Sequence, residues 1–241
     1  MLRTRTWVTA SVLFTTALLL APAPALAQNH SVNFTVGAFI PTGFDGRADE
    51  DILVNELSGP YRLAFDVRDF NGATVGVDWL VGFGRYIDAG LGVAYYRRTV
   101  PSVYDLFTHP SGAEIEQDLR LRIVPITASV RIYPMGKYSG FQPYIGGGVA
   151  FLSWRYSEAG DFVDPVDDSI FDFRYEHDDT TAAPVFLGGL RATVGDRAIV
   201  GGEVRYQKAE GDLPTGGTEG FISDRIDLGG WTTNFTIGVR F

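Results

Sequence analysis

The chain of 241 residues is acidic, with 20 Lys and Arg against 29 Asp and Glu and a formal net charge of −9. A nucleic-acid-binding surface has to neutralise phosphates, so this charge argues against nucleic acid as a partner. The chain has no cysteine, which excludes disulfides and thiolate metal sites. The apolar content of 45% is compatible with a β-barrel, in which every second side chain meets lipid, and also with a secreted β-sandwich.

The first 27 residues have the pattern of a secretory signal peptide. Arg3 and Arg5 precede an apolar run from Trp7 to Leu20, and an A-x-A cleavage motif ends at Ala27. This run is shorter than the roughly 20 residues that a membrane-spanning helix needs, with a signal anchor as the alternative. We therefore predict a signal peptide at 1–27 and one β-domain at 28–241, with 18 basic and 29 acidic residues and a net charge of −11.

Segments in which apolar and polar residues alternate follow one another along the rest of the chain and predict eight strands. In chain order they span about 31–41, 73–83, 86–98, 118–133, 141–156, 182–194, 198–207 and 230–241. Short turns alternate with long connections at about 42–71, 99–117, 157–181 and 208–227. This rhythm predicts an all-β fold, an eight-stranded antiparallel up-and-down transmembrane β-barrel with both termini at the end of the short turns.

The fourth predicted strand changes phase along its length. Leu119, Leu121 and Ile123 alternate in one phase, and the apolar residues from Val124 onward alternate in the other. Because this change falls beside Pro125, which cannot donate a backbone hydrogen bond, we predict a β-bulge there.

The last predicted strand alternates strictly and ends on an aromatic residue. Trp231, Phe235, Ile237, Val239 and Phe241 share one face, which suits lipid outside and a polar interior. Phe235, Ile237, Val239 and Phe241 resemble the C-terminal signal that barrel-insertion machinery reads. That machinery is therefore an expected partner, and the outer membrane of a Gram-negative-type bacterium, with periplasmic termini, is the expected location.

Charged residues on predicted inward faces are the main candidate site. They are Asp78, Asp88, Arg131, Glu203, Arg205 and Arg240. An eight-stranded barrel is only wide enough for side chains to fill it, so we expect these charges to pair and form a plug. The alternative is a gated conduit, or a proton-linked switch, in which the pairs exchange partners.

The long connections suggest two further possibilities. Carboxylates gather between Glu158 and Asp179, where they could bind a divalent cation or bridge through it to lipopolysaccharide, although no EF-hand spacing is present. Apolar residues in the first two connections could pack as a cap or line a pocket for a small hydrophobic ligand. Asp49-Glu50-Asp51 could begin a short helix, because acidic residues favour a first turn.

Sequence motifs for catalysis are lacking. The histidines His30, His109 and His177 belong to no Ser-His-acid pattern, and neither H-E-x-x-H nor G-x-S-x-G occurs. We expect no enzymatic activity, no cofactor and no specific metal site.

These residues resemble the small outer-membrane β-barrel proteins related to OmpW and to the membrane domain of OmpA. The stretches that carry the resemblance are 118–131, 142–148, 201–206 and the Phe241 terminus. The resemblance implies the barrel fold; OmpW-like members are thought to pass small hydrophobic compounds, whereas OmpA-type barrels are chiefly structural. The leading hypothesis is a non-enzymatic barrel with a filled polar lumen, long acidic external loops and a structural or surface-interaction role. An OmpW-like, porin-like conduit for small hydrophobic molecules is the alternative.

Overall fold

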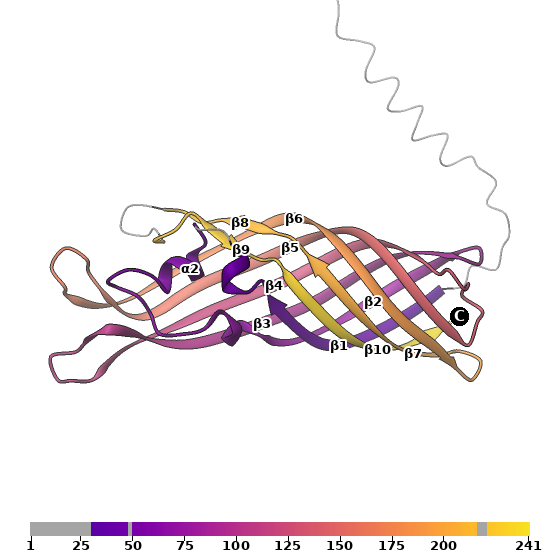
Figure 1. The fold of residues 1–241 in the computed structure, drawn as a ribbon, viewed down its shortest axis with the longest axis horizontal. Coiled ribbons are helices and arrows are strands. Elements are labelled where there is room, and N and C mark those ends of the chain that lie inside the picture. Colours follow the sequence, from indigo (N-terminus) through magenta and orange to yellow (C-terminus); the bar gives the residue numbers. More distant parts are fainter. Residues whose placement is uncertain (1–29, 48–49, 216–220) are drawn as a thin grey trace, which may run out of the picture.

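Eight antiparallel strands close into a barrel in the computed structural model, which describes residues 30–47, 50–215 and 221–241 (Figure 1). The strand order around the barrel is β1-β10-β7-β6-β5-β4-β3-β2. The barrel strands are β1 (His30–Pro41), β2 (Gly72–Phe83), β3 (Ile87–Thr108), β4 (Glu114–Ile132), β5 (Phe141–Val163), β6 (Ile170–Val194), β7 (Ala198–Gln207) and β10 (Gly230–Arg240). The predicted eight-stranded barrel is therefore confirmed, while the predicted signal peptide at 1–27 lies outside the described residues.

The short turns and the C-terminus lie at one end of the barrel, called here the terminal end (Figure 1). The other end is the loop end, where the first long connection forms η1 (Phe44–Gly46), α2 (Ile52–Glu56) and η2 (Val67–Phe70). A small separate sheet of β8 (Glu210–Asp212) and β9 (Arg225–Asp227) lies there as well. The predicted short helix is confirmed as α2, because the Asp51 carboxylate caps it by accepting from the backbone N–H of Leu53 at 2.9 Å.

The terminal half of the barrel carries an outward apolar belt. Large apolar side chains there are exposed, as in Phe34 at 64% and Phe241 at 63%. Aromatic residues mark its two edges, with Phe83, Tyr86, Tyr138, Phe141 and Phe241 at one and Tyr95, Phe186, Tyr206 and Trp231 at the other. Strands rise about 3.3 Å per residue, so the stretch from Trp231 to Phe241, tilted by about 40°, spans about 25 Å, the height of the apolar band of membrane barrels.

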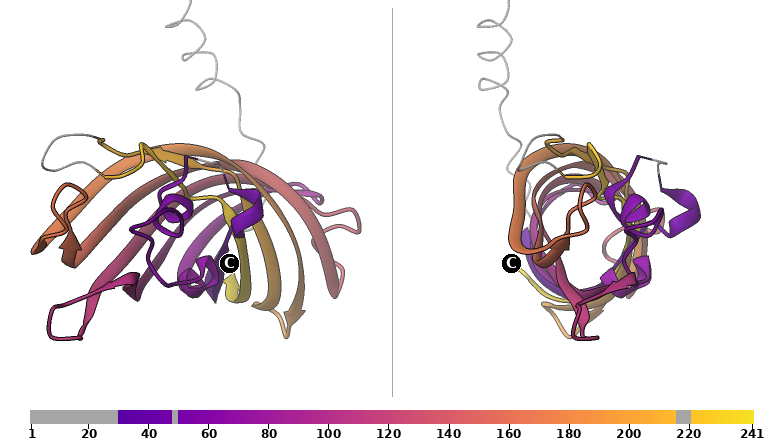
Figure 2. Two further views of the ribbon diagram at one scale, coloured as in Figure 1. Left: turned by 60° about the vertical axis from the view of Figure 1, so that its left-hand side comes forward. Right: turned by 90° about the vertical axis from the view of Figure 1, so that its left-hand side faces the viewer.

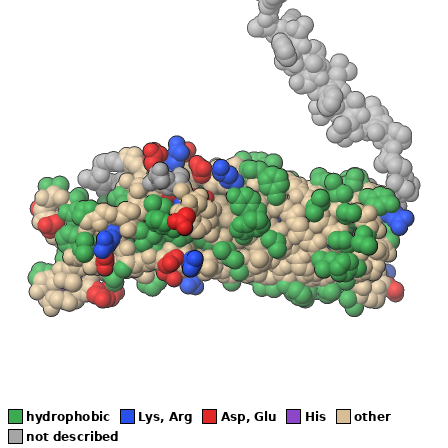
Figure 3. All heavy atoms as spheres, in the orientation of Figure 1, with side chains coloured by type: hydrophobic (Ala, Val, Ile, Leu, Met, Phe, Trp, Pro, Cys, Tyr) green, Lys and Arg blue, Asp and Glu red, His purple; other side chains and the backbone are tan. Residues whose placement is uncertain are grey.

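Charged side chains gather over the loop-end half of the surface, while the terminal half shows mainly apolar and uncharged side chains (Figure 3). The described part of the chain contains no helix with the length and hydropathy needed to span a membrane.

Strands β3 to β6 continue far beyond the apolar belt. They contain 22, 19, 23 and 25 residues, against 10 to 12 in β1, β2, β7 and β10. The second and third long connections predicted from the sequence, 99–117 and 157–181, are therefore mostly strand, and only 109–113 and 164–169 lie between strands. This prediction was wrong because the residues beyond the belt continue the strand ladders, as Ser157 does by pairing with Glu176.

The predicted β-bulge at Pro125 is absent. The pairing of β4 with β5 runs without a register shift from Gln117 opposite Gly160 to Ile132 opposite Ile145. Leu119, Leu121 and Ile123, which precede the phase change, are buried inside the barrel. The apolar pattern changes phase because lipid lies outside the terminal half, whereas the loop-end half encloses an apolar core of its own.

That core closes the loop-end half. The four long strands form a curved wall, and the described parts of the segments 42–71 and 208–229 lie against its open side (Figure 2). Buried residues of the first segment, such as Ile52 and Leu53, pack in one cluster with Trp154 and Tyr156 of β5. The predicted apolar cap is thus present as a packed core.

One buried ion pair fastens these two segments to each other. The Asp51 carboxylate accepts from Arg47 Nε at 3.0 Å and Nη2 at 2.9 Å, and both side chains are essentially unexposed. Arg47 also donates to the backbone carbonyl of Asp227 at 2.8 Å, and the Asp227 N–H donates to Asp51.

Replacing Asp51 by alanine should therefore release the segments 42–71 and 208–229 while leaving the belt half of the barrel folded. The variant leaves the buried Arg47 guanidinium without its carboxylate, with only backbone carbonyls as partners, and removes the cap of α2, losses of about 3–5 and about 1 kcal/mol. Limited proteolysis in detergent should cut both segments faster than in the native protein, with the far-UV β-signal retained. Unchanged cleavage rates would contradict the assigned role.

Candidate functional site

Two clusters of charged side chains fill the lumen within the belt. In the first, Arg131 of β4 lies 2.9 Å from Glu203 of β7 and 3.2 Å from Asp78 of β2. Arg205 of β7 lies 2.8 Å from Glu203 and 3.7 Å from Asp78. The hydroxyl of Tyr144 donates to Glu203 at 3.0 Å. Four strands thus supply one buried network across the barrel.

The second cluster is centred on Asp88 of β3, nearer the terminal end. One carboxylate oxygen accepts from Lys137 Nζ at 2.7 Å and the other from Arg191 Nη2 at 2.7 Å. Arg191 also donates to Gln142 at 3.1 Å, and Arg240 reaches the same amide oxygen at 3.4 Å.

Tyrosine rings separate the clusters. The guanidinium of Arg191 lies 4.4 Å from the centre of the Tyr133 ring, and that of Arg131 lies 5.5 Å from the centre of the Tyr144 ring. The two rings pack on each other with their centres 5.4 Å apart. Cations over aromatic faces are attracted by the ring quadrupole. The two tyrosine rings therefore interact favourably with the guanidinium groups of both clusters.

The six charged residues singled out from the sequence are divided between these clusters. Asp78, Arg131, Glu203 and Arg205 meet in the first, Asp88 anchors the second, and Arg240 is at the edge of the second. The sequence reasoning missed Lys137, which belongs to a turn, and Arg191. The tight turn that pairs Val194 with Ala198 could have revealed Arg191, because its register places Arg191 opposite Gly201, in phase with Glu203.

The ladder between β3 and β4 is interrupted beside Pro125. Residues of β3 and β4 pair up to Val93 opposite Ile126 and again from Tyr96 opposite Ile123, but the two positions between them form no ladder pairs. Since proline has no N–H to donate, Pro125 removes a hydrogen bond at this point. The register of β3 and β4 is the same on both sides of the two unpaired positions, so the ladder is interrupted without a bulge.

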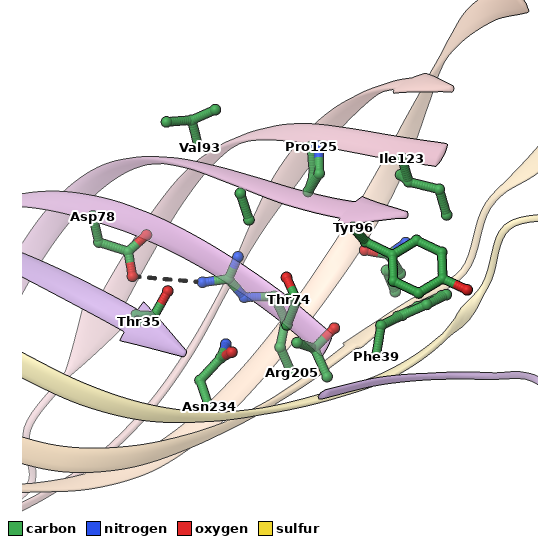
Figure 4. Close-up of a pocket in the computed structure, with 13 residues that line it drawn as sticks. Thr35, Phe39, Thr74, Asp78, Val93, Tyr96, Ile123, Pro125, Arg205 and Asn234 are labelled. Atoms are coloured by element: carbon green, nitrogen blue, oxygen red, sulfur yellow. Dashed lines mark ion pairs between the residues drawn. The ribbon is translucent and has the colours of Figure 1, made fainter. Parts of the chain in front are cut away.

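A small lumen pocket of about 30 Å³ lies behind this break, on the loop side of the first charged cluster (Figure 4). Val93, Ala94 and Pro125 line it on the side of the break, and Asp78 and Arg205 line its other side. Its size is that of about one or two water-sized spheres. The pocket therefore lies between the first charged cluster and the break in the β3–β4 ladder.

A larger pocket of about 710 Å³, called here the outer pocket, lies at the loop end. Aromatic residues are the largest group in its walls, and they come from five parts of the chain: Tyr61 of the first connection, Tyr104 of β3, Phe162 of β5, Phe171, Phe173 and Tyr175 of β6, and Phe221 between β8 and β9. The predicted possibility of an apolar pocket in the loops thus has a physical counterpart. Tyr61 and Tyr104 were among the residues that suggested it.

Two buried carboxyl groups belong to the outer pocket. Glu56 ends α2 and Glu158 lies on the extension of β5, and both are largely inaccessible to solvent. Burial raises the pKa of Glu158 to about 7, and burial together with the charge of Glu158 raises the pKa of Glu56 well above its usual range. The sequence placed Glu158 in a long connection, which was wrong because its segment is part of β5.

The other carboxylates of that acidic stretch are dispersed. Asp161 lies 3.3 Å from His109, Asp168 accepts from the Tyr61 hydroxyl at 3.0 Å, and Asp178 lies 3.2 Å from Arg155. Within the described ranges no three His, Asp or Glu side chains are grouped so as to hold a metal ion.

The four C-terminal residues proposed as an insertion signal lie on the outer surface. Phe235, Ile237, Val239 and Phe241 are all more than half exposed. The Phe241 ring stacks on His30 of β1 with the ring centres 5.8 Å apart, and its backbone pairs with that of His30. The signal residues are therefore part of the seam between the first and last strands.

No protein-family model and no curated protein matches the chain. Among solved structures it is similar to the outer-membrane protein OprG of Pseudomonas aeruginosa, with 15% identity, a TM-score of 0.52, and coverage of 89% of this chain and 96% of that one. OmpW of Escherichia coli has 18% identity, a TM-score of 0.44, and coverage of 90% and 100%. Neisserial surface protein A has 12% identity, a TM-score of 0.43, and coverage of 88% and 95%. The fold is that of small eight-stranded outer-membrane β-barrels, which confirms the resemblance inferred from the sequence at the level of fold.

Proposed function

We propose that this chain is a non-enzymatic outer-membrane barrel with a closed lumen, which presents its extended loop end to the surroundings in a structural or surface-interaction role. The observation that supports this proposal is the first charged cluster. Arg131 is held between Asp78 and Glu203, which come from strands on different sides of the barrel, and so it crosses the lumen. Buried pairs with this many contacts leave no space for a water-filled path.

We further propose how the barrel is oriented in the outer membrane and what contacts each part of its surface. The termini face the periplasm, lipid hydrocarbon covers the belt, and the charged loop-end surface meets lipopolysaccharide, whose phosphates the acidic loops would contact through divalent cations. Barrel-insertion machinery reads Phe235, Ile237, Val239 and Phe241. The aromatic edges of the belt support this arrangement, since such rings prefer the interface between hydrocarbon and water.

A closed lumen predicts negligible ion current. The protein reconstituted in planar bilayers in 1 M KCl should give no stepwise conductance above that of empty bilayers. The variant D78A/R131A/E203A/R205A, which truncates the whole first cluster, provides the control for a barrel with its constriction removed and should pass ions. Stable open levels in the native protein would contradict the proposal.

A second candidate function is that of a conduit for small hydrophobic molecules, from the outer pocket to the bilayer. The observation that favours it is the break in the β3–β4 ladder at Pro125, which adjoins the lumen pocket on the loop side of the charged cluster. A molecule leaving the lumen there would pass into lipid without crossing the ion pairs.

The break can be closed chemically. In the variant A94C/P125C, oxidation should join the two strands where their ladder is interrupted, and uptake of a fluorescent hydrophobic dye into the bilayer of proteoliposomes should fall and recover on reduction. The matched control is T99C/R120C, a facing pair in the intact part of the same ladder, where oxidation should leave uptake unchanged. Equal uptake in the oxidised and reduced forms of A94C/P125C would rule this path out.

A further inference from the structure

The outer pocket has an unusual balance of side chains. Aromatic rings form most of its wall, and its charged lining residues are all acidic: Glu56, Glu158 and Asp164. No Lys, Arg or His is among the described residues that line it. An apolar cavity with only negative charge is suited to a cation that carries an apolar body.

Glu158 is the clearest sign that a ligand group is missing. Its side chain is 3% exposed, and its Oε1 atom is buried without a hydrogen-bond partner. The hydroxyl of Tyr156 is also buried; it interacts with this carboxyl and lowers the pKa of Glu158, but the two groups make no hydrogen bond of normal geometry. Unpaired buried oxygens are costly, because they lose their bonds to water and gain nothing in return. A donor that enters the pocket would recover this loss.

Neither Gln117 nor Arg47 fills this role. Gln117 donates to the Tyr104 hydroxyl and to the carbonyl of Asp161, both at 3.1 Å, so its amide protons are engaged. The buried guanidinium of Arg47 is committed to Asp51 and to backbone carbonyls. Glu56 is a second acid and supplies a donor only while it is protonated.

We infer that the outer pocket binds an apolar amine, with the ammonium group at the Glu56–Glu158 carboxyl pair and the apolar body against the aromatic walls. Aromatic faces attract such cations as well as packing on their apolar parts. If the amine enters in its charged form, one carboxyl proton leaves to the solvent, so that the bound site holds an ammonium ion and a carboxylate. The inference deepens the second candidate function, since it names a ligand class for the pocket at which that path would start.

The acidity of the groups around the pocket sets the expected pH dependence. Burial raises the pKa of Tyr104 to about 12 and raises that of Tyr175, and the hydrogen bond to Asp168 raises that of Tyr61, so all three stay neutral at neutral pH. Glu56, Glu158 and the partly buried Asp164 are the acids that face the ligand. Binding of a permanent cation should therefore strengthen as pH rises from 5.5 to 8, when the buried pair can release a proton.

Three probes of one shape test the inference: 4-phenylbutylamine, 4-phenylbutanol and 4-phenylbutyltrimethylammonium. Binding is measured by calorimetry on the full-length mature protein in nanodiscs of zwitterionic lipid, with empty nanodiscs subtracted to remove partitioning. At pH 8 both cations should bind on the order of tenfold more tightly than the alcohol. For the trimethylammonium ion, titrations in buffers of different ionisation enthalpy should show proton release near pH 6.5, and the alcohol should show none.

Substitutions in the outer pocket test which residues produce the preference for cations. E158Q should lower the affinity for both cations on the order of tenfold and leave the affinity for the alcohol unchanged. E116Q is the matched control, because Glu116 is an exposed acid on the same loop-end half that does not line the outer pocket. E56Q provides a second variant in case E158Q does not fold. The comparison of the three probes at different pH values on the native protein tests the preference for amines without any variant.

Two results would overturn the inference. If the alcohol binds as tightly as the cations, or if E158Q and E56Q both leave cation binding unchanged, the pocket has no preference for amines, although it could still admit apolar molecules. If no probe binds, the inference fails together with the use of this pocket in the second candidate function. The dye-uptake experiment on A94C/P125C tests that path separately.

Discussion

Replacing Arg131 by methionine is expected to lower the free energy of unfolding by about 3–5 kcal/mol, the usual loss when one partner of a buried ion pair is removed. Arg131 contacts both Glu203 and Asp78, and only Arg205 remains to serve these two carboxylates in the variant. Urea unfolding from lipid vesicles, followed by tryptophan fluorescence and by heat-modifiable mobility on gels, measures the change.

R205M is the informative comparison. In that variant Glu203 keeps both Arg131 and the Tyr144 hydroxyl, and Asp78 keeps Arg131 at 3.2 Å. The loss should therefore be clearly smaller than for R131M. Equal losses would show that the cluster does not depend on Arg131 as its centre, and the absence of any loss in R131M would contradict the buried network itself.

The second large effect concerns pH and Glu158. Burial raises the pKa of this carboxyl to about 7 in the folded protein, while an unfolded glutamate has a pKa of about 4.3. The folded state therefore holds a proton that the unfolded state has already lost, so the contribution of Glu158 to stability is largest below pH 4 and falls as pH rises towards 7. Across this range the loss is on the order of 3 kcal/mol.

The E158Q variant should lose most of this dependence, because glutamine stays neutral at every pH. Between pH 4.5 and pH 8 the urea midpoint of the native protein should fall more than that of E158Q, and at pH 8 the variant should be the more stable of the two. The exposed control E116Q should follow the native curve. Parallel curves for the native protein and E158Q would show that Glu158 is not protonated in the fold.

These expectations describe a barrel with two different interiors. Within the belt the lumen is held by ion pairs that span strands, while the loop-end half has an apolar core that ends in a pocket with buried acids. The proposed closed-lumen function depends on the first interior, and the inferred amine site depends on the second. Experiments on Arg131 and on Glu158 therefore address separate parts of the molecule.

The sequence by itself determined that the chain forms a barrel, which belt residues face outward, and which charged residues, with few exceptions, lie in the lumen. Strict alternation makes this possible, because a strand has two faces and lipid accepts only apolar side chains on one of them. The inward placement of Asp78, Arg131 and Glu203 follows from parity alone. Arg191 was also within reach, since the turn at 195–197 fixes its register.

Only the tertiary structure decided what lies beyond the belt. There, apolar and polar residues still alternate, but the apolar ones face the interior and not lipid. Leu119, Leu121 and Trp154 pack in a core that distant segments complete. The positions of 42–71 and 208–229 depend on contacts such as that between Arg47 and Asp227, which are 180 residues apart and leave no local pattern. The burial of Glu158, and with it the character of the outer pocket, arises from this long-range packing.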